Sequence, residues 1–72
     1  MSNDDIPMRR FPLDGYTIAE LAEFYSQTIY VMEQWLAPHN EAIGIRNGRF
    51  FTPMQVKKIL ESIGPPKGYY YL

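Results

Sequence analysis

The side chains that could carry out chemistry in this 72-residue chain favour binding over catalysis. Glu20 and Glu23 could act as an acid and base, but Glu20 is explained by a helix cap and both are interpreted as solvated surface. His39 has no histidine or cysteine near it, and a metal site needs three or four converging ligands. Without cysteine there is no disulfide, iron–sulfur cluster or thiol nucleophile. No phosphate-binding glycine loop or catalytic triad is present. We therefore predict no enzyme activity, no cofactor, no metal and no small-molecule substrate.

Charge is divided unevenly along the chain, although its formal net value is only −1. Residues 14–41 carry five carboxylates and no lysine or arginine, whereas residues 42–72 carry five basic residues and one carboxylate. This pattern predicts an acidic half and a basic half of the surface, with chance clustering on a solvated surface as the alternative.

The basic residues of the second half could contact phosphates. Arg46 and Arg49 flank Asn47 in a predicted turn, and Lys57 and Lys58 lie on the polar side of a predicted helix. Such side chains are typical of a phosphate-contacting surface. The alternative is a soluble turn and an exposed helix face.

Three stretches show the apolar spacing of an amphipathic helix, and the first and third have it at i, i+3, i+4 and i+7. They predict helices at about 18–25, 27–37 and 53–63. The expected buried faces are Ile18, Leu21, Ala22 and Tyr25 in the first, Ile29, Met32, Trp35 and Leu36 in the second, and Val56, Ile59, Leu60 and Ile63 in the third.

The helix ends carry their own signals. Thr17 with Glu20, and Thr52 with Gln55, have the spacing of capping boxes, in which each partner satisfies a backbone amide of the other. About three residues join the first two helices, and Ser26 stands where a glycine is common. These signals predict a tight corner between two short helices.

An Asn-Gly pair at 47–48 is a strong signal for a hairpin turn, so we expect a two-stranded hairpin at about 43–51. The order helix, tight turn, helix, hairpin, helix is that of a small, mainly α, winged helix-turn-helix. We expect this domain at 11–66, a flexible arm at 1–10 and an aromatic tail at 67–72.

Both ends of the chain leave alternatives open. Arg9 and Arg10 could enter a DNA minor groove or could simply be a flexible basic pair. The three tyrosines at 69–71 could stack on bases, pack as an extra strand or mediate self-association. We favour packing, because three aromatic side chains seldom stay wholly exposed on a tail.

Two segments resemble known DNA-binding domains. Residues 16–22, Tyr-Thr-Ile-Ala-Glu-Leu-Ala, resemble the opening of MerR-type and excisionase-like winged helix-turn-helix domains. Residues 49–53, Arg-Phe-Phe-Thr-Pro, are similar to the junction between wing and last helix in the same superfamily. The run Phe-Thr-Pro-Met-Gln-Val at 51–56 looks closer still to a group of short uncharacterised bacterial proteins that carry a domain of unknown function.

The resemblance implies a recognition helix in the DNA major groove and a wing over the backbone. By position, the helix would present Thr28, Tyr30, Val31, Glu33 and Gln34, and the wing Arg46, Asn47 and Arg49, with Lys57 and Lys58 in support. The sequence departs from the family pattern, because MerR-type recognition helices usually carry arginine where this chain has Tyr30 and Glu33. Carboxylates held against phosphates oppose binding, since basic contacts dominate DNA affinity.

Two functions follow from these observations. The first is a DNA-binding accessory or transcription-regulator protein that uses the helix-turn-helix and a basic wing. The alternative is a protein–protein interaction module, because Tyr30, Val31 and Gln34 would form an aromatic, uncharged face. The other interpretation of these residues is that Val31 is half-buried and Tyr30 covers the edge of the core. Double-stranded DNA, a protein partner or a second copy are the expected partners. The acidic start lacks signal-peptide features and no apolar run could cross a bilayer, so we expect a cytoplasmic protein.

Overall fold

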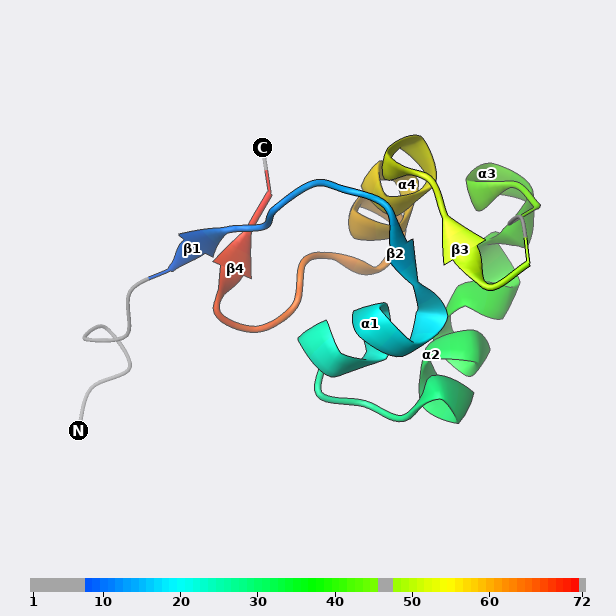
Figure 1. The fold of residues 1–72 in the computed structure, drawn as a ribbon, viewed down its shortest axis with the longest axis horizontal. Helices are drawn as coiled ribbons and strands as arrows, with labels where there is room; N and C mark the ends of the chain where they lie inside the picture. Colours follow the sequence, from blue (N-terminus) through cyan, green and yellow to red (C-terminus); the bar gives the residue numbers. More distant parts are fainter. Residues whose placement is uncertain (1–7, 46–47, 72) are drawn as a thin grey trace.

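A computed structural model describes residues 8–45 and 48–71 as a small, mainly helical fold (Figure 1). The elements follow one another as β1 (Arg9–Arg10), β2 (Tyr16–Thr17), α1 (Ile18–Phe24), α2 (Ile29–Leu36), the 3₁₀ turn η2 (Ala37–His39), α3 (Asn40–Ile43), β3 (Phe50–Phe51), α4 (Pro53–Ile63) and β4 (Tyr69–Tyr70). The predicted helices at 18–25, 27–37 and 53–63 correspond to α1, α2 and α4, so the mainly α prediction is confirmed.

Each main helix begins at a threonine cap. Thr17 Oγ1 accepts from the Glu20 amide at 3.1 Å, and Glu20 Oε1 accepts from the Thr17 amide at 2.8 Å. Thr52 and Gln55 make the same pair of hydrogen bonds at 3.2 and 3.0 Å. Both predicted capping boxes are confirmed. Because a capping box satisfies amides that the helix leaves unpaired, it fixes where α1 and α4 begin.

One apolar cluster joins the helices. Its buried members are Phe11, Ile18, Leu21, Ala22, Met32, Leu36, Ile43, Phe51, Val56, Ile59 and Leu60. Two predicted core residues of α2 are exceptions, since Ile29 is 43% exposed and Trp35 is 41% exposed. The buried arc of α2 is narrow and centred on Met32 and Leu36, so Ile29 and Trp35 fall on its two flanks. Trp35 instead stands edge-on to the Tyr25 ring, with centroids 6.3 Å apart.

The corner between α1 and α2 is tight, as predicted. Ser26 has φ of +57°, in the left-handed region where a glycine would cost less. The amide of Gln27 reaches back to the Ala22 carbonyl at 2.8 Å. The Tyr25 hydroxyl donates to the Gly64 carbonyl at 2.6 Å and so ties the corner to the end of α4. Burial raises the pKa of Tyr25 to about 12.

The predicted hairpin at 43–51 is wrong. Ile43 ends the short helix α3, and Phe50–Phe51 pairs antiparallel with Tyr16–Thr17 rather than with a neighbouring strand. The reason is that Leu36 and Ile43 are seven residues apart, the spacing of one helical face, and both are buried in the core. The chain therefore stays helical beyond Pro38 until Gly44, whose φ is +89°.

The β2–β3 pair is antiparallel, so α1 leaves one end of it and α4 leaves the other. Tyr16 lies opposite Phe51, Thr17 lies opposite Phe50, and the amide of Ile18 donates to the Arg49 carbonyl at 3.1 Å. A ladder of this length is marginal alone, and buried Phe51 anchors it to the core.

The two ends of the described chain form a second, parallel pair. Arg9 lies opposite Tyr69 and Arg10 opposite Tyr70, so these arginines belong to a strand instead of a flexible arm (Figure 1). Residues 1–7 lie outside the described residues. The predicted packing of the tyrosine tail is confirmed, because Tyr69 and Tyr71 lie against the core.

Candidate interaction surfaces

The outward face of α2 holds the residues that were predicted to read DNA. Tyr30 is 70% exposed, and Glu33 and Gln34 are exposed beside it. Thr28 is the cap of α2, and its hydroxyl accepts from the Val31 amide at 3.1 Å. Thr28 is thus explained by helix structure, while Tyr30 and Gln34 remain as outward-facing side chains. Val31 is half-buried, as expected in the interpretation in which these residues do not form an interaction face.

The structure separates the predicted basic residues. Arg49 and Glu33 line one pocket of about 310 Å³ together with Ile18, Ala19 and Ile29, so Arg49 lies beside α2. Lys57 and Lys58 are exposed on α4. Neither lysine lines the pocket that Arg49 forms beside α2. Arg46 and Asn47 lie outside the described residues.

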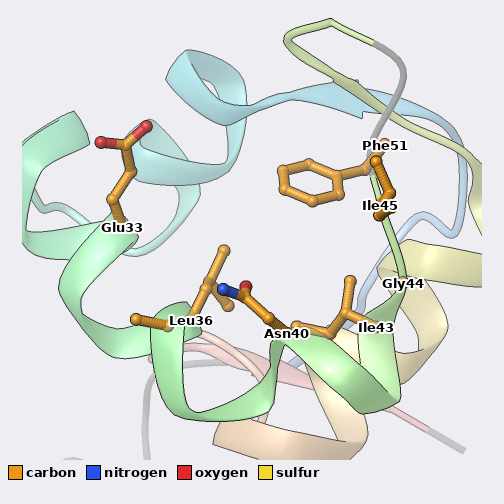
Figure 2. A pocket seen from close by; sticks show the side chains of 8 residues that line it. Glu33, Leu36, Asn40, Ile43, Gly44, Ile45 and Phe51 are labelled. Carbon is orange, nitrogen blue, oxygen red and sulfur yellow. The ribbon is translucent and has the colours of Figure 1, made fainter.

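A larger hollow lies between α2, α3 and the segment that leads to β3, and we call it the α2–α3 groove. Its volume is about 370 Å³. Leu36, Ile43 and Phe51 form an apolar floor, and in Figure 2 the Phe51 ring points into the hollow from the side opposite Leu36. Glu33, Ala37, Asn40, Gly44 and Ile45 complete the lining.

The rim of the groove is polar on the helix side and apolar on the loop side. Glu33 and Asn40 come from α2 and α3, and Ile45 stands across from Glu33 (Figure 2). Ile45 is 97% exposed, while its carbonyl accepts from Gln55 Nε2 at 3.0 Å. That bond ties the backbone at Ile45 to α4. Sequence reasoning missed this site because it assigned Ile43 and Ile45 to a strand.

The helices around the groove are acidic. Glu33 on α2 lines the groove and Glu41 lies on α3, and neither helix contains lysine or arginine. Glu20 and Glu23 lie on α1 and do not line the groove. Phosphate groups would meet carboxylates beside the groove, whereas a cationic side chain would meet attraction.

The part of the chain that the structure describes shows neither a metal site nor a membrane span. Across residues 8–45 and 48–71, no three His, Asp or Glu side chains are grouped closely enough to hold a metal ion. Within the same residues, no helix has the length and apolar character needed to span a bilayer.

Comparisons with known proteins found no match to this chain among family models, curated proteins or solved structures. The resemblance to MerR-type and excisionase-like domains stays a prediction from the sequence. Function must therefore be inferred from the surfaces described above.

Proposed function

We propose that this chain is a small protein-recognition domain whose α2–α3 groove receives an apolar side chain of a partner protein. The observation that carries the proposal is the groove itself, which combines the apolar floor of Leu36, Ile43 and Phe51 with the 97% exposed side chain of Ile45. A fully exposed isoleucine beside an apolar hollow gains free energy when a partner covers both.

The chemistry of the partner follows from the rim. Glu33 can accept a hydrogen bond from a lysine or arginine, and Asn40 can accept from or donate to a peptide group. A segment with an apolar residue next to a basic one fits both the floor and the rim. Charge attraction to the carboxylates of Glu33 and Glu41 on α2 and α3 would speed its encounter with this face.

The fold suits this role as a helix-turn-helix derivative. We interpret α1, the Ser26 corner and α2 as the helix-turn-helix unit, with α2 in the place of the recognition helix. In this interpretation the groove lies beside the recognition helix, and Gly44, Ile45 and Phe51 complete its lining. Its lining is apolar and acidic, which suits a protein better than a phosphate backbone.

Double-stranded DNA is the second candidate, and a specific observation favours it. Arg49 lines a pocket with Glu33 beside α2, the helix that also carries Tyr30 and Gln34, so it could supply a phosphate contact there. Lys57 and Lys58 are exposed on α4 and do not line this pocket.

The deciding experiment selects binders from a random peptide library on the immobilised chain and measures the winners with the Ile45→Asp variant. We expect enriched peptides to carry an apolar residue beside lysine or arginine, and their affinity to fall by about tenfold or more in Ile45→Asp. Met54→Asp is the matched control, because Met54 is 62% exposed on α4 and does not line the groove. Peptides that bind Ile45→Asp as tightly as the wild type would overturn the proposal.

A titration of a labelled mixed-sequence duplex tests the second candidate. Binding that falls steeply with salt and is weakened by Arg46→Ala with Arg49→Ala would establish DNA as the ligand and retire the groove as the principal site. Absence of binding even at low salt would retire the DNA candidate.

A further inference from the structure

A different surface, at the end of the molecule where β1 and β4 meet, gathers aromatic rings from four segments. Phe11 lies at the centre, 2% exposed, with the rings of Tyr16, Phe24 and Tyr69 at centroid distances of 5.8, 4.8 and 5.7 Å. We call Tyr16, Phe24 and Tyr69 the aromatic box. It shares no residue with the α2–α3 groove.

The box lies along an open pocket of about 420 Å³, which its three rings line together with Glu20 and Glu23. The Phe24 ring lies 5.2 Å from Tyr16 at 72° and 5.6 Å from Tyr69 at 78°. Tyr16 and Tyr69 therefore stand as two walls nearly perpendicular to Phe24. Edge-to-face packing at these distances holds the three rings together beside the hollow.

The walls are held by the backbone. The Tyr16 hydroxyl donates to the Pro12 carbonyl at 2.6 Å, and Tyr16 is paired with Phe51 in β2–β3. Tyr69 is paired with Arg9 in β1–β4, and its amide donates to the Pro66 carbonyl at 3.0 Å. A box held in place before binding loses little entropy when a ligand enters.

The charge of the lining selects the ligand. Glu20 and Glu23 are the charged residues among the five that line the pocket, and both are exposed on α1. Burial raises the pKa of the Tyr16 hydroxyl, and the carboxylates of Asp14 and Glu20 raise it further, as expected where the local potential is negative. Negative ring faces and carboxylates together disfavour anions and attract cations.

We propose that the aromatic box binds an alkylated ammonium group. A methylated ammonium carries its charge on apolar methyl groups, so it loses less hydration than a bare ammonium when it contacts three rings. Glu23, on the rim, supplies the counter-charge. The group could come from a free quaternary amine or from a methylated lysine of a protein.

The test is an NMR titration of the full chain with choline and with its neutral isostere, in which carbon replaces the quaternary nitrogen. We expect choline to shift the amides of Glu23, Phe24 and Tyr69, and the isostere to bind more weakly. A peptide with trimethyllysine, compared with the same peptide carrying unmodified lysine, distinguishes the two sources. Tighter binding of the methylated peptide than of choline indicates a protein ligand, and equal binding indicates the free amine.

Matched variants locate the site. Tyr69→Leu and Glu23→Gln should each weaken choline binding about two- to fivefold, the loss that one exposed cation contact produces. Tyr70→Leu and Glu41→Gln are the controls, because neither residue lines the pocket and both are exposed. Equal binding of choline and its isostere, or equal loss in the control variants, would overturn the proposal. So would the absence of any shift.

Discussion

The aromatic box and the α2–α3 groove are assembled in opposite ways. The box unites Tyr16, Phe24 and Tyr69, with Phe11 behind them, so it needs both ends of the described chain. The groove is lined by residues between Glu33 and Phe51, a single stretch that runs through α2, η2, α3 and the next loop. Contacts between distant segments form only in the complete fold, whereas a helical path is largely encoded locally. We therefore expect that a substitution in one of the two surfaces can disrupt it and leave the other intact.

Replacing Phe11 with Ala is expected to have the largest effect. Phe11 is buried and contacts all three rings of the box, so its truncation should cost about 3–5 kcal/mol of unfolding free energy. That is a large part of the roughly 4–11 kcal/mol that a domain of this size has in total. Urea unfolding followed by circular dichroism measures the loss.

Leu36→Ala is the counterpart in the groove, because Leu36 is also buried but lies on the groove floor. It should cost about 2–5 kcal/mol and leave the choline-induced shifts of the box in place wherever the variant is folded. Phe11→Leu, which keeps an apolar side chain, should recover much of the stability without restoring the ring contacts. Choline shifts lost in Leu36→Ala but kept in Phe11→Ala would contradict the separation of the two surfaces.

Removing a threonine cap should lower the unfolding free energy by about 1 kcal/mol, and two such caps can be compared. Thr17→Ala at the start of α1 removes the acceptor for the Glu20 amide, and Thr28→Ala at the start of α2 removes the acceptor for the Val31 amide. Each should lower the unfolding free energy by about 0.5–2 kcal/mol. Thr17→Ala should cost more, because it also breaks a reciprocal capping box. Thermal unfolding of both variants beside the wild type gives the order, and a larger loss in Thr28→Ala would contradict it.

Tyr25 ties the corner between α1 and α2 to the end of α4. Removing its hydroxyl is expected to have the smallest effect on the unfolding free energy, and that effect should depend on pH. Below pH 10 the hydrogen bond to Gly64 should make the wild type about 0.5–1.5 kcal/mol more stable than Tyr25→Phe. The pKa of Tyr25 is raised from 10.0 to about 12 in the folded state. Above pH 10 the unfolded chain loses this proton first, so the advantage should decline as pH rises toward 12.

Urea unfolding at several alkaline pH values measures that decline. Tyr30→Phe serves as the control, since Tyr30 is 70% exposed on α2. A difference between wild type and Tyr25→Phe that stays constant from pH 9 to pH 12 would show that the buried hydroxyl is not responsible.

Much of the helical framework could be predicted from local signals. The capping boxes at Thr17 and Thr52 lie where the sequence predicted them, and the apolar spacing identified the buried faces of α1 and α4. Ser26 was predicted at the corner and adopts the left-handed conformation. These features depend on neighbours within one or two helical turns, so a single sequence carries enough information to place them.

The pairing of strands could not be predicted in the same way. Two-residue strands are too short to show a periodic pattern in the sequence. The Asn-Gly pair at 47–48 predicts a hairpin, but it gives no sign that Ile43 is buried in the core as part of a helix. The exposure of Trp35 could not be predicted for a similar reason. Helical spacing gives the direction of a side chain on its helix, but not whether another part of the chain packs against it. The same limit applies to the candidate DNA residues, since Lys57 and Lys58 lie on α4 and do not line the pocket that Arg49 forms beside α2.

The sequence by itself determined the three main helices, their caps, the tight corner and the acidic character of the first half, all of which depend on residue types and short spacings. Tertiary structure alone decided that Tyr16–Thr17 pairs with Phe50–Phe51, that Arg9–Arg10 pairs with Tyr69–Tyr70, and that the aromatic box forms. The physical reason is that the box depends on which distant side chains the core brings together, and that choice is made by packing the whole chain at once.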